Sequence, residues 1–159
     1  KDAEKVIKLF KGTNLTLEYS KDTRSVSLLG ILKNIYALST GLSDGLSLGS
    51  NFRSCVALQA VKEIQEILSE VGGKKESFLT YAGLSDFLAT AYSSKSRNYQ
   101  YGRAWGEGKK ATDNLAEGVD NIARIKKYTK HASEKPLFRA IENIFKKNKE
   151  PRKELLRAI

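Results

Sequence analysis

The residue types that could carry chemistry gather in two short stretches. Asp86, Thr90 and Arg97 supply an acid, a hydroxyl and a guanidinium within twelve residues, and Asn98 follows directly. Upstream, Lys33–Asn34 interrupts an apolar run. A lysine and an acid suit proton transfer, and an arginine suits the binding of a phosphate. Together these residues predict half of a site for a small phosphorylated substrate.

Lys33 is surrounded in the sequence by apolar residues, and two interpretations stay open. In the first interpretation, its ammonium extends past the apolar face into water. Alternatively, it is held away from water, where giving up its proton is easier and proton transfer near neutral pH becomes possible. Asp86 also has two interpretations, because it could interact with the dipole of its own helix or pair with Lys33.

Ser96 and Arg97 lie at the expected start of a helix. The free N–H groups of a helix N-terminus, a hydroxyl and an arginine fork together form a cradle for a phosphate. The alternative is a surface arginine next to a serine that caps the helix. Spacing alone does not decide between the two.

Several classes of site lack the residues they need. His131 is the only histidine and has no companion at metal-ligand spacing, so we expect it at the surface and predict no metal site. Cys55 is the only cysteine, and its place among apolar helix positions predicts a buried, inert thiol. Gly41, Gly45 and Gly49 recur every four residues without a preceding strand, so they do not form a dinucleotide-binding fingerprint.

The chain has 159 residues and a net charge of +10. Residues 109–159 hold much of this charge, with 14 Lys and Arg against 7 Asp and Glu. Such a surface can bind nucleic acid or an acidic partner, attract anionic metabolites, or simply be a solvated helix face. The basic residues are spread among Glu and Asp and form no uninterrupted basic arm, so we expect no nucleic acid as a partner. The charges within residues 26–48 argue against a membrane span. The single cysteine fits a reducing compartment, so we expect a cytoplasmic protein.

The hydrophobic pattern predicts a mainly α protein with one short helix over 5–11 and one strand over 14–19 before the helical part begins. The further helices are expected over 25–41, 51–71, 76–82, 84–92, 97–105 and 116–131, and after Pro136 and Pro151. A lone strand is not stable, and the chain contains no methionine. We therefore expect a fragment in which residues 1–20 are the edge of a missing dinucleotide-binding domain and residues 21–159 form a helical substrate-binding domain.

Several segments, in this order, resemble the C-terminal substrate-binding domain of NAD(P)-dependent glycerol-3-phosphate dehydrogenases. Gly30–Asn34 is similar to the family's Gly-x-Leu-Lys-Asn segment. Ala82–Asp86 and Ser96–Asn98 resemble its Ala-Gly-Leu-Gly-Asp and Ser-Arg-Asn segments, and Ala116–Gly118 resembles a late Val-Glu-Gly. The glycine-punctuated stretch between them is similar at Gly41, Asp44, Gly45, Gly49 and Asn51.

The resemblance implies a multi-helical fold of the 6-phosphogluconate-dehydrogenase-like type, and a reaction that interconverts glycerol 3-phosphate and dihydroxyacetone phosphate with NAD or NADP. It implies that Lys33 gives and takes the proton at the substrate C2 oxygen. It assigns substrate binding to Asn34, Asp86, Thr90, Ser96, Arg97 and Asn98, and cofactor contacts to Arg97, Leu115 and Glu117. The implied partners are a Rossmann domain of the same protein and a second copy in a homodimer, so this chain alone is expected to be inactive.

Four positions depart from the family pattern. Ser27 stands where Glu is usual, Gln59 and Ala60 replace Arg and Gly, and Ser85 replaces Gly. Two other functions therefore stay open. One is a diverged or non-catalytic helical module that binds an acidic partner or nucleic acid through its basic half, and the other is a related hydroxyacid or polyol dehydrogenase domain.

Overall fold

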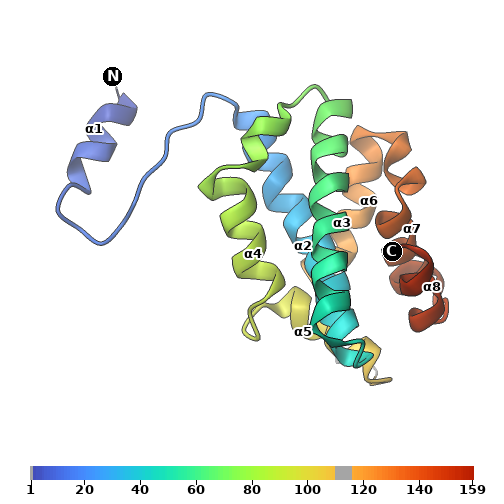
Figure 1. Cartoon of the computed structure of the whole chain (residues 1–159). Coiled ribbons are helices and arrows are strands. Elements are labelled where there is room, and N and C mark those ends of the chain that lie inside the picture. The colour runs from blue at the N-terminus through green and yellow to red at the C-terminus, as the bar shows by residue number, and fades with distance from the viewer. Residues whose placement is uncertain (1, 110–115) are drawn as a thin grey trace.

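The computed structural model describes residues 2–109 and 116–159, and the regular structure in these ranges is helical (Figure 1). The mainly α prediction is confirmed, and Pro136 and Pro151 each stand in the first turn of a helix as expected. The helices are α1 (Asp2–Leu9), α2 (Thr23–Gly45), α3 (Gly49–Glu70), α4 (Asp86–Ala91), α5 (Arg97–Gly106), α6 (Glu117–Tyr128), α7 (Pro136–Lys147) and α8 (Pro151–Arg157). Three short helical turns connect them: η1 (Lys75–Phe78), η2 (Tyr81–Ser85) and η3 (Lys130–Glu134).

Helix α2 forms the centre of the domain, and its sequence explains why. Apolar residues occur on nearly all of its sides, so the helix is stable only where other helices surround it. In the structure α3, α4, α5, α6 and α7 all pack against α2, and Leu32, Ile35 and Leu38 are fully buried. Asp22 caps the helix, because its side chain accepts a hydrogen bond from the Ser25 N–H at 3.0 Å.

Helices α2 and α5 meet through glycines. Gly41 and Gly45 lie on one face of α2, and Gly102 and Gly106 lie on the facing side of α5, since residues four apart share a helix face. A Cβ atom on any of these four residues would collide with backbone atoms of the other helix. The four-residue spacing of Gly41 and Gly45 therefore serves the close packing that positions α5.

A buried carboxylate ties α7 to α3. Glu63 is 1% exposed, and its oxygens accept hydrogen bonds from the N–H groups of Leu137 and Phe138 at 2.7 and 2.9 Å. These N–H groups lie in the first turn of α7, where they have no partner inside the helix and favour negative charge. The Tyr36 hydroxyl and the Gln59 amide also donate to Glu63, at 2.9 and 3.0 Å. Burial, and then the charge of Glu63, raise the pKa of Tyr36 well above its usual value.

Helix α1 lies apart from the helical body, and the segment after it leads back to α2 (Figure 1). Helix α1 has no buried residue. The prediction of a strand over 14–19 is wrong, because residues 15–20 form no regular secondary structure. The alternating pattern does favour an extended backbone, but a strand also needs a neighbouring strand to pair its N–H and C=O groups, and residues 2–109 and 116–159 provide none.

Cys55 is exposed, so the prediction of a buried thiol is wrong. The buried face of α3 is formed by Val56, Ala60 and Ile64, and consecutive helix residues point about 100° apart, which turns Cys55 away from that face. His131 is exposed as expected. Within the part of the chain that the structure describes, no helix is long and apolar enough to cross a membrane.

Candidate functional site

The centre of the candidate site is an ion pair between α2 and α4. Lys33 Nζ donates to Asp86 Oδ2 at 2.5 Å, although the two residues are 53 positions apart in the sequence. Their side chains are 23% and 39% exposed. Of the interpretations that the sequence left open, the structure favours pairing, because the Lys33 ammonium is partly buried and directed at a carboxylate.

The turn before α4 places Asp86. Residues Tyr81–Ser85 form a π-helical turn, a conformation that occurs frequently at functional sites. Gly83 lies within it, and a Cβ there would collide with the Phe78 carbonyl group. Thr90 lies one turn after Asp86 on the same side of α4, and its hydroxyl donates to the Asp86 carbonyl at 2.8 Å. The two residues therefore stand together on α4.

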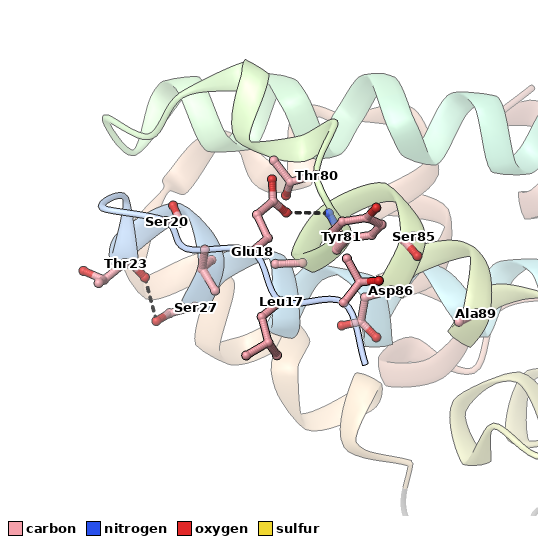
Figure 2. Close-up of a pocket in the computed structure, with 13 residues that line it drawn as sticks. Leu17, Glu18, Ser20, Thr23, Ser27, Thr80, Tyr81, Ser85, Asp86 and Ala89 are labelled. Atoms are coloured by element: carbon pink, nitrogen blue, oxygen red, sulfur yellow. Dashed lines mark hydrogen bonds between the residues drawn. The ribbon is translucent and has the colours of Figure 1, made fainter. Parts of the chain in front are cut away.

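A pocket of about 750 Å³ opens beside Asp86 (Figure 2). Its walls come from the extended segment before α2, the first turns of α2, and η2 with α4. Glu18 of the extended segment accepts a hydrogen bond from the Tyr81 N–H at 3.0 Å, which holds the segment against η2. The lining is rich in hydroxyl groups, from Thr16, Ser20, Thr23, Ser27, Thr80 and Ser85.

The four departures from the family pattern fall into two places. Ser27 and Ser85 line the pocket beside Asp86. Gln59 and Ala60 lie on α3, where Ala60 is buried and the Gln59 amide contacts the buried carboxylate of α3. One pair of these positions therefore lies in the wall of the candidate site, and the other lies on α3 next to the buried Glu63 carboxylate or in the core.

The residues predicted to bind a phosphate and a cofactor lie at the first turns of α5 and α6. Ser96 caps α5, because its Oγ accepts a hydrogen bond from the Tyr99 N–H at 3.4 Å. Arg97 is exposed at the first position of α5, and Glu117 is exposed at the first position of α6. Leu115, also predicted to contact the cofactor, lies outside the described residues.

Asn34 and Asn98 are both buried, and they contact each other. Asn98 Nδ2 donates to Asn34 Oδ1 at 3.0 Å, and Asn98 Oδ1 accepts a hydrogen bond from the Gly118 N–H at 2.8 Å. These bonds join the three segments that carry Lys33, Arg97 and the start of α6. The structure thus brings together motifs that lie far apart in the sequence.

A polar cluster near the end of α2 was not predicted from the sequence. Asp44 accepts hydrogen bonds from the Arg53 guanidinium and the Tyr99 hydroxyl, and Arg53 lies over the Tyr92 ring at 4.9 Å from its centroid. Burial, and then the Asp44 carboxylate, raise the pKa of Tyr99. An acid within an apolar helical run could have indicated this cluster. Glu18 was missed too, and no local pattern marks it.

Part of the positive charge in the C-terminal half is neutralised by ion pairs within the chain. Lys126 pairs with Glu142 at 2.5 Å, and Lys135 pairs with Glu66 and Glu70 at 2.8 and 2.7 Å. Among residues 2–109 and 116–159, no group of three or more His, Cys, Asp or Glu side chains is arranged to hold a metal ion.

The fold and the site together define a mainly helical domain in which the carboxylate of a lysine–carboxylate pair lines an open pocket. The family described as NAD-dependent glycerol-3-phosphate dehydrogenase C-terminus matches residues 22–156. The chain belongs to this family.

Similar proteins carry the corresponding name. Glycerol-3-phosphate dehydrogenase (NAD(P)+) of Coxiella burnetii is 33% identical over 153 residues, which are 92% of this chain and 46% of that protein. The enzyme of Thermus thermophilus is 38% identical over 121 residues, which are 76% of this chain and 34% of that protein. The crystal structure of the C. burnetii glycerol-3-phosphate dehydrogenase has a TM-score of 0.85 at 32% identity, covering 98% of this chain and 50% of that one. The chain therefore spans about half the length, or less, of the relatives it matches.

Proposed function

We propose that this chain is the substrate-binding and catalytic half of a glycerol-3-phosphate dehydrogenase, which interconverts sn-glycerol 3-phosphate and dihydroxyacetone phosphate with NAD or NADP. The observation that carries the proposal is the 2.5 Å contact between Lys33 and Asp86, because Asp86 lines a pocket large enough for a small substrate. Membership of the family and the names of the relatives support the reaction.

Lys33 moves the proton in this proposal. When dihydroxyacetone phosphate is reduced, a hydride adds to C2, and Lys33 Nζ gives a proton to the C2 oxygen. In the opposite direction, the C2 hydroxyl gives its proton to neutral Nζ as the hydride leaves C2. Asp86 holds Nζ in place, and Thr90 on the same side of α4 orients the substrate beside it.

Ser96 and Arg97 bind the phosphate. The first turn of α5 offers backbone N–H groups and the positive end of the helix dipole, and Arg97 adds a guanidinium that can donate two parallel hydrogen bonds. A net charge of +10 favours the approach of an anionic substrate. These features suit a phosphorylated substrate better than a neutral polyol.

The nicotinamide cofactor supplies or accepts the hydride when it is bound. Arg97 and Glu117 offer a guanidinium and a carboxylate at exposed helix starts, which suit the reactive end of the cofactor. Residues 2–109 and 116–159 contain no strand followed by a phosphate-binding loop, so they do not fit the rest of the cofactor. We therefore assign the rest of the cofactor site to a Rossmann domain in the longer protein. Residues 1–20 form the edge of that domain, and residues 21–159 are the substrate domain.

Two further elements complete the proposal. The resemblance supports a homodimer. The single cysteine of this chain suits a reducing compartment, which supports a cytoplasmic protein.

The proposal is tested by replacing Lys33 in the intact protein. Lys33→Ala should lower kcat for dihydroxyacetone phosphate reduction by about 100-fold or more, because a positioned proton-transfer group contributes on this scale. Lys62→Ala, at an exposed position of α3, is the matched control and should leave kcat unchanged. An unchanged kcat in Lys33→Ala contradicts the proposed role.

A substrate panel separates the proposal from its alternatives. The intact protein should prefer glycerol 3-phosphate over hydroxyacids and unphosphorylated polyols, whereas the 159-residue chain alone should not oxidise NADH. A preference for a hydroxyacid would support the related dehydrogenase. Activity of the isolated chain would contradict the assignment of the cofactor site to a second domain.

A further inference from the structure

Four side chains from four different segments meet near the end of α2. The Asp44 carboxylate accepts hydrogen bonds from the Arg53 guanidinium on α3 and from the Tyr99 hydroxyl in the first turn of α5. The Arg53 guanidinium also lies over the ring of Tyr92, 4.9 Å from its centroid, and Tyr92 directly follows α4. We call these four residues the clamp. It joins the end of α4 to the start of α5, at the end of the domain where these segments meet α2 and α3 (Figure 1).

The clamp is largely shielded from water. Tyr99 is 6% exposed, and the side chains of Arg53 and Asp44 are 27% and 21% exposed. Both donors bond the same carboxylate oxygen, Asp44 Oδ2. Partial burial strengthens such charged hydrogen bonds, and removal of one partner leaves the others without theirs. The end of α4 is also fixed on α2, because the Thr40 hydroxyl donates to the Ala91 carbonyl at 2.7 Å.

The clamp closes the connection between the two parts of the candidate site. Helix α4 carries Asp86, which bonds the Lys33 ammonium, and α5 begins at Arg97. Residues 92–96 connect the two helices, and the clamp holds both ends of this short connection. The pocket beside Asp86 is not lined by any of the four clamp residues. The clamp therefore sets the distance between the proton-transferring pair and the start of α5 from outside the pocket.

We propose that the clamp determines the specificity of this site for the length of its substrate, by fixing the spacing between the reacting carbon and the phosphate. The inference rests on the proposed function, in which Lys33 acts at the C2 oxygen and Arg97 binds the phosphate. The clamp residues are positioning residues, because they act through these two side chains and not on the substrate.

The substrate that tests the spacing is a homologue of glycerol 3-phosphate. In glycerol 3-phosphate one CH2 group lies between C2 and the phosphate ester oxygen. In 3,4-dihydroxybutyl phosphate a second CH2 group lies between the reacting carbon and that oxygen. The longer homologue satisfies both contacts only if it buckles or if α4 and α5 shift relative to each other. A site with a fixed spacing should therefore favour glycerol 3-phosphate, and a loosened site should favour it less.

Substitutions of Tyr99 and Arg53 in the intact protein test the proposal. Tyr99→Phe removes the hydroxyl that bonds Asp44 and keeps the buried ring, and Arg53→Leu removes both contacts of the guanidinium. The measured quantity is kcat/KM for oxidation of glycerol 3-phosphate divided by kcat/KM for the longer homologue. This ratio should fall by about tenfold in each variant, because a misplacement of about 1 Å can lower a rate by about 100-fold and affects the matched substrate most.

Three further measurements separate the specificity role from a purely structural one. Tyr101→Phe is the matched control, because it makes the same change two residues further along α5, where Tyr101 lies against Trp105 and Phe145. It should leave the ratio unchanged. Arg53→Lys keeps a positive charge for Asp44, so it should restore part of the ratio that Arg53→Leu loses. Urea unfolding of each variant reports stability, and Tyr99→Phe provides the test if Arg53→Leu does not fold.

The outcomes distinguish the clamp from the proposed function. An unchanged ratio in a folded Tyr99→Phe or Arg53→Leu variant overturns the specificity role, even if the variant is less stable, and leaves the proposed function standing. An equal fall in Tyr101→Phe overturns it as well. A wild-type protein that oxidises both substrates equally well shows that the site does not measure length, which also overturns the role. A wild-type protein without activity toward glycerol 3-phosphate overturns the proposed function and the specificity role together.

Discussion

The pair of Lys33 and Asp86 leads to a prediction in which activity and stability separate. Asp86→Asn keeps the size of the side chain and removes the charge that holds Lys33 Nζ. The two side chains are 23% and 39% exposed, so water screens much of their attraction. Ion pairs of this exposure contribute about 0–1 kcal/mol to folding. We therefore expect the free energy of unfolding to fall by no more than about 1 kcal/mol.

The expected effect of Asp86→Asn on turnover is larger. In the proposed reaction Lys33 Nζ has to lie within hydrogen-bond reach of the substrate C2 oxygen. Asp86 holds it there through a 2.5 Å contact. Loss of this contact should lower kcat by about 100-fold, which corresponds to about 2.7 kcal/mol in activation free energy.

The assay for Asp86→Asn combines urea unfolding, followed by far-UV circular dichroism, with the rate of NADH oxidation by the intact protein. Glu107→Gln is a suitable control, because the Glu107 carboxylate pairs with Arg103 and Lys109 at 2.9 and 2.5 Å. Glu107 follows the C-terminal end of α5, whereas the candidate phosphate site lies at its N-terminal end. This control should change stability by a similar small amount and leave kcat unchanged. If Asp86→Asn lost about 3 kcal/mol of stability or kept its full kcat, the reasoning would be refuted and the pair would be structural.

Three further predictions follow from single residues. Arg97→Lys in the intact protein should weaken the binding of glycerol 3-phosphate by about 1.5–3 kcal/mol, which is the scale of a hydrogen bond to a charged group. The binding of unphosphorylated glycerol should weaken much less. Equal losses for the two substrates would contradict the assignment of Arg97 to the phosphate. Glu63→Ala should lower the free energy of unfolding in urea by about 3 kcal/mol or more, because it leaves several buried donors unpaired; a loss below about 1 kcal/mol would contradict this. Hydrogen bonds from Ser25 and Ser77 lower the pKa of Asp22 from 3.8 to about 2, so its contribution is complete above about pH 4 and lost as the pH falls toward 2. Asp22→Asn should therefore lose less stability than the wild type across this pH window in acid unfolding, and an equal loss would show that Asp22 does not contribute.

The sequence by itself determined most of the helices of this protein. Apolar periodicity indicated the central helix and the long helix that follows, and Pro136 and Pro151 indicated the starts of α7 and α8. The motifs at Gly30–Asn34 and Ser96–Asn98 indicated the family, which the match over residues 22–156 confirms. These features are local, because helix propensity, capping and short motifs are read within a few neighbouring residues.

Where the sequence was insufficient, the deciding contact came from distant residues. The strand expected over 14–19 lacks a pairing strand within the described residues, and Cys55 is exposed because the partners of α3 cover a different face. The sequence offered pairing of Lys33 with Asp86 as one of two interpretations, and the tertiary structure favoured it.

Only the tertiary structure revealed the hydrogen bonds of Glu63 and those of the two buried asparagines, Asn34 and Asn98. Glu63 lies 74 positions before Leu137, and Asn98 lies 64 positions after Asn34, so no local pattern links either pair. Their hydrogen bonds form only when packing brings the helices together and excludes water, and the cost of a buried polar group without a partner then makes each bond specific. The sequence determined which elements form, and packing decided which polar side chains meet.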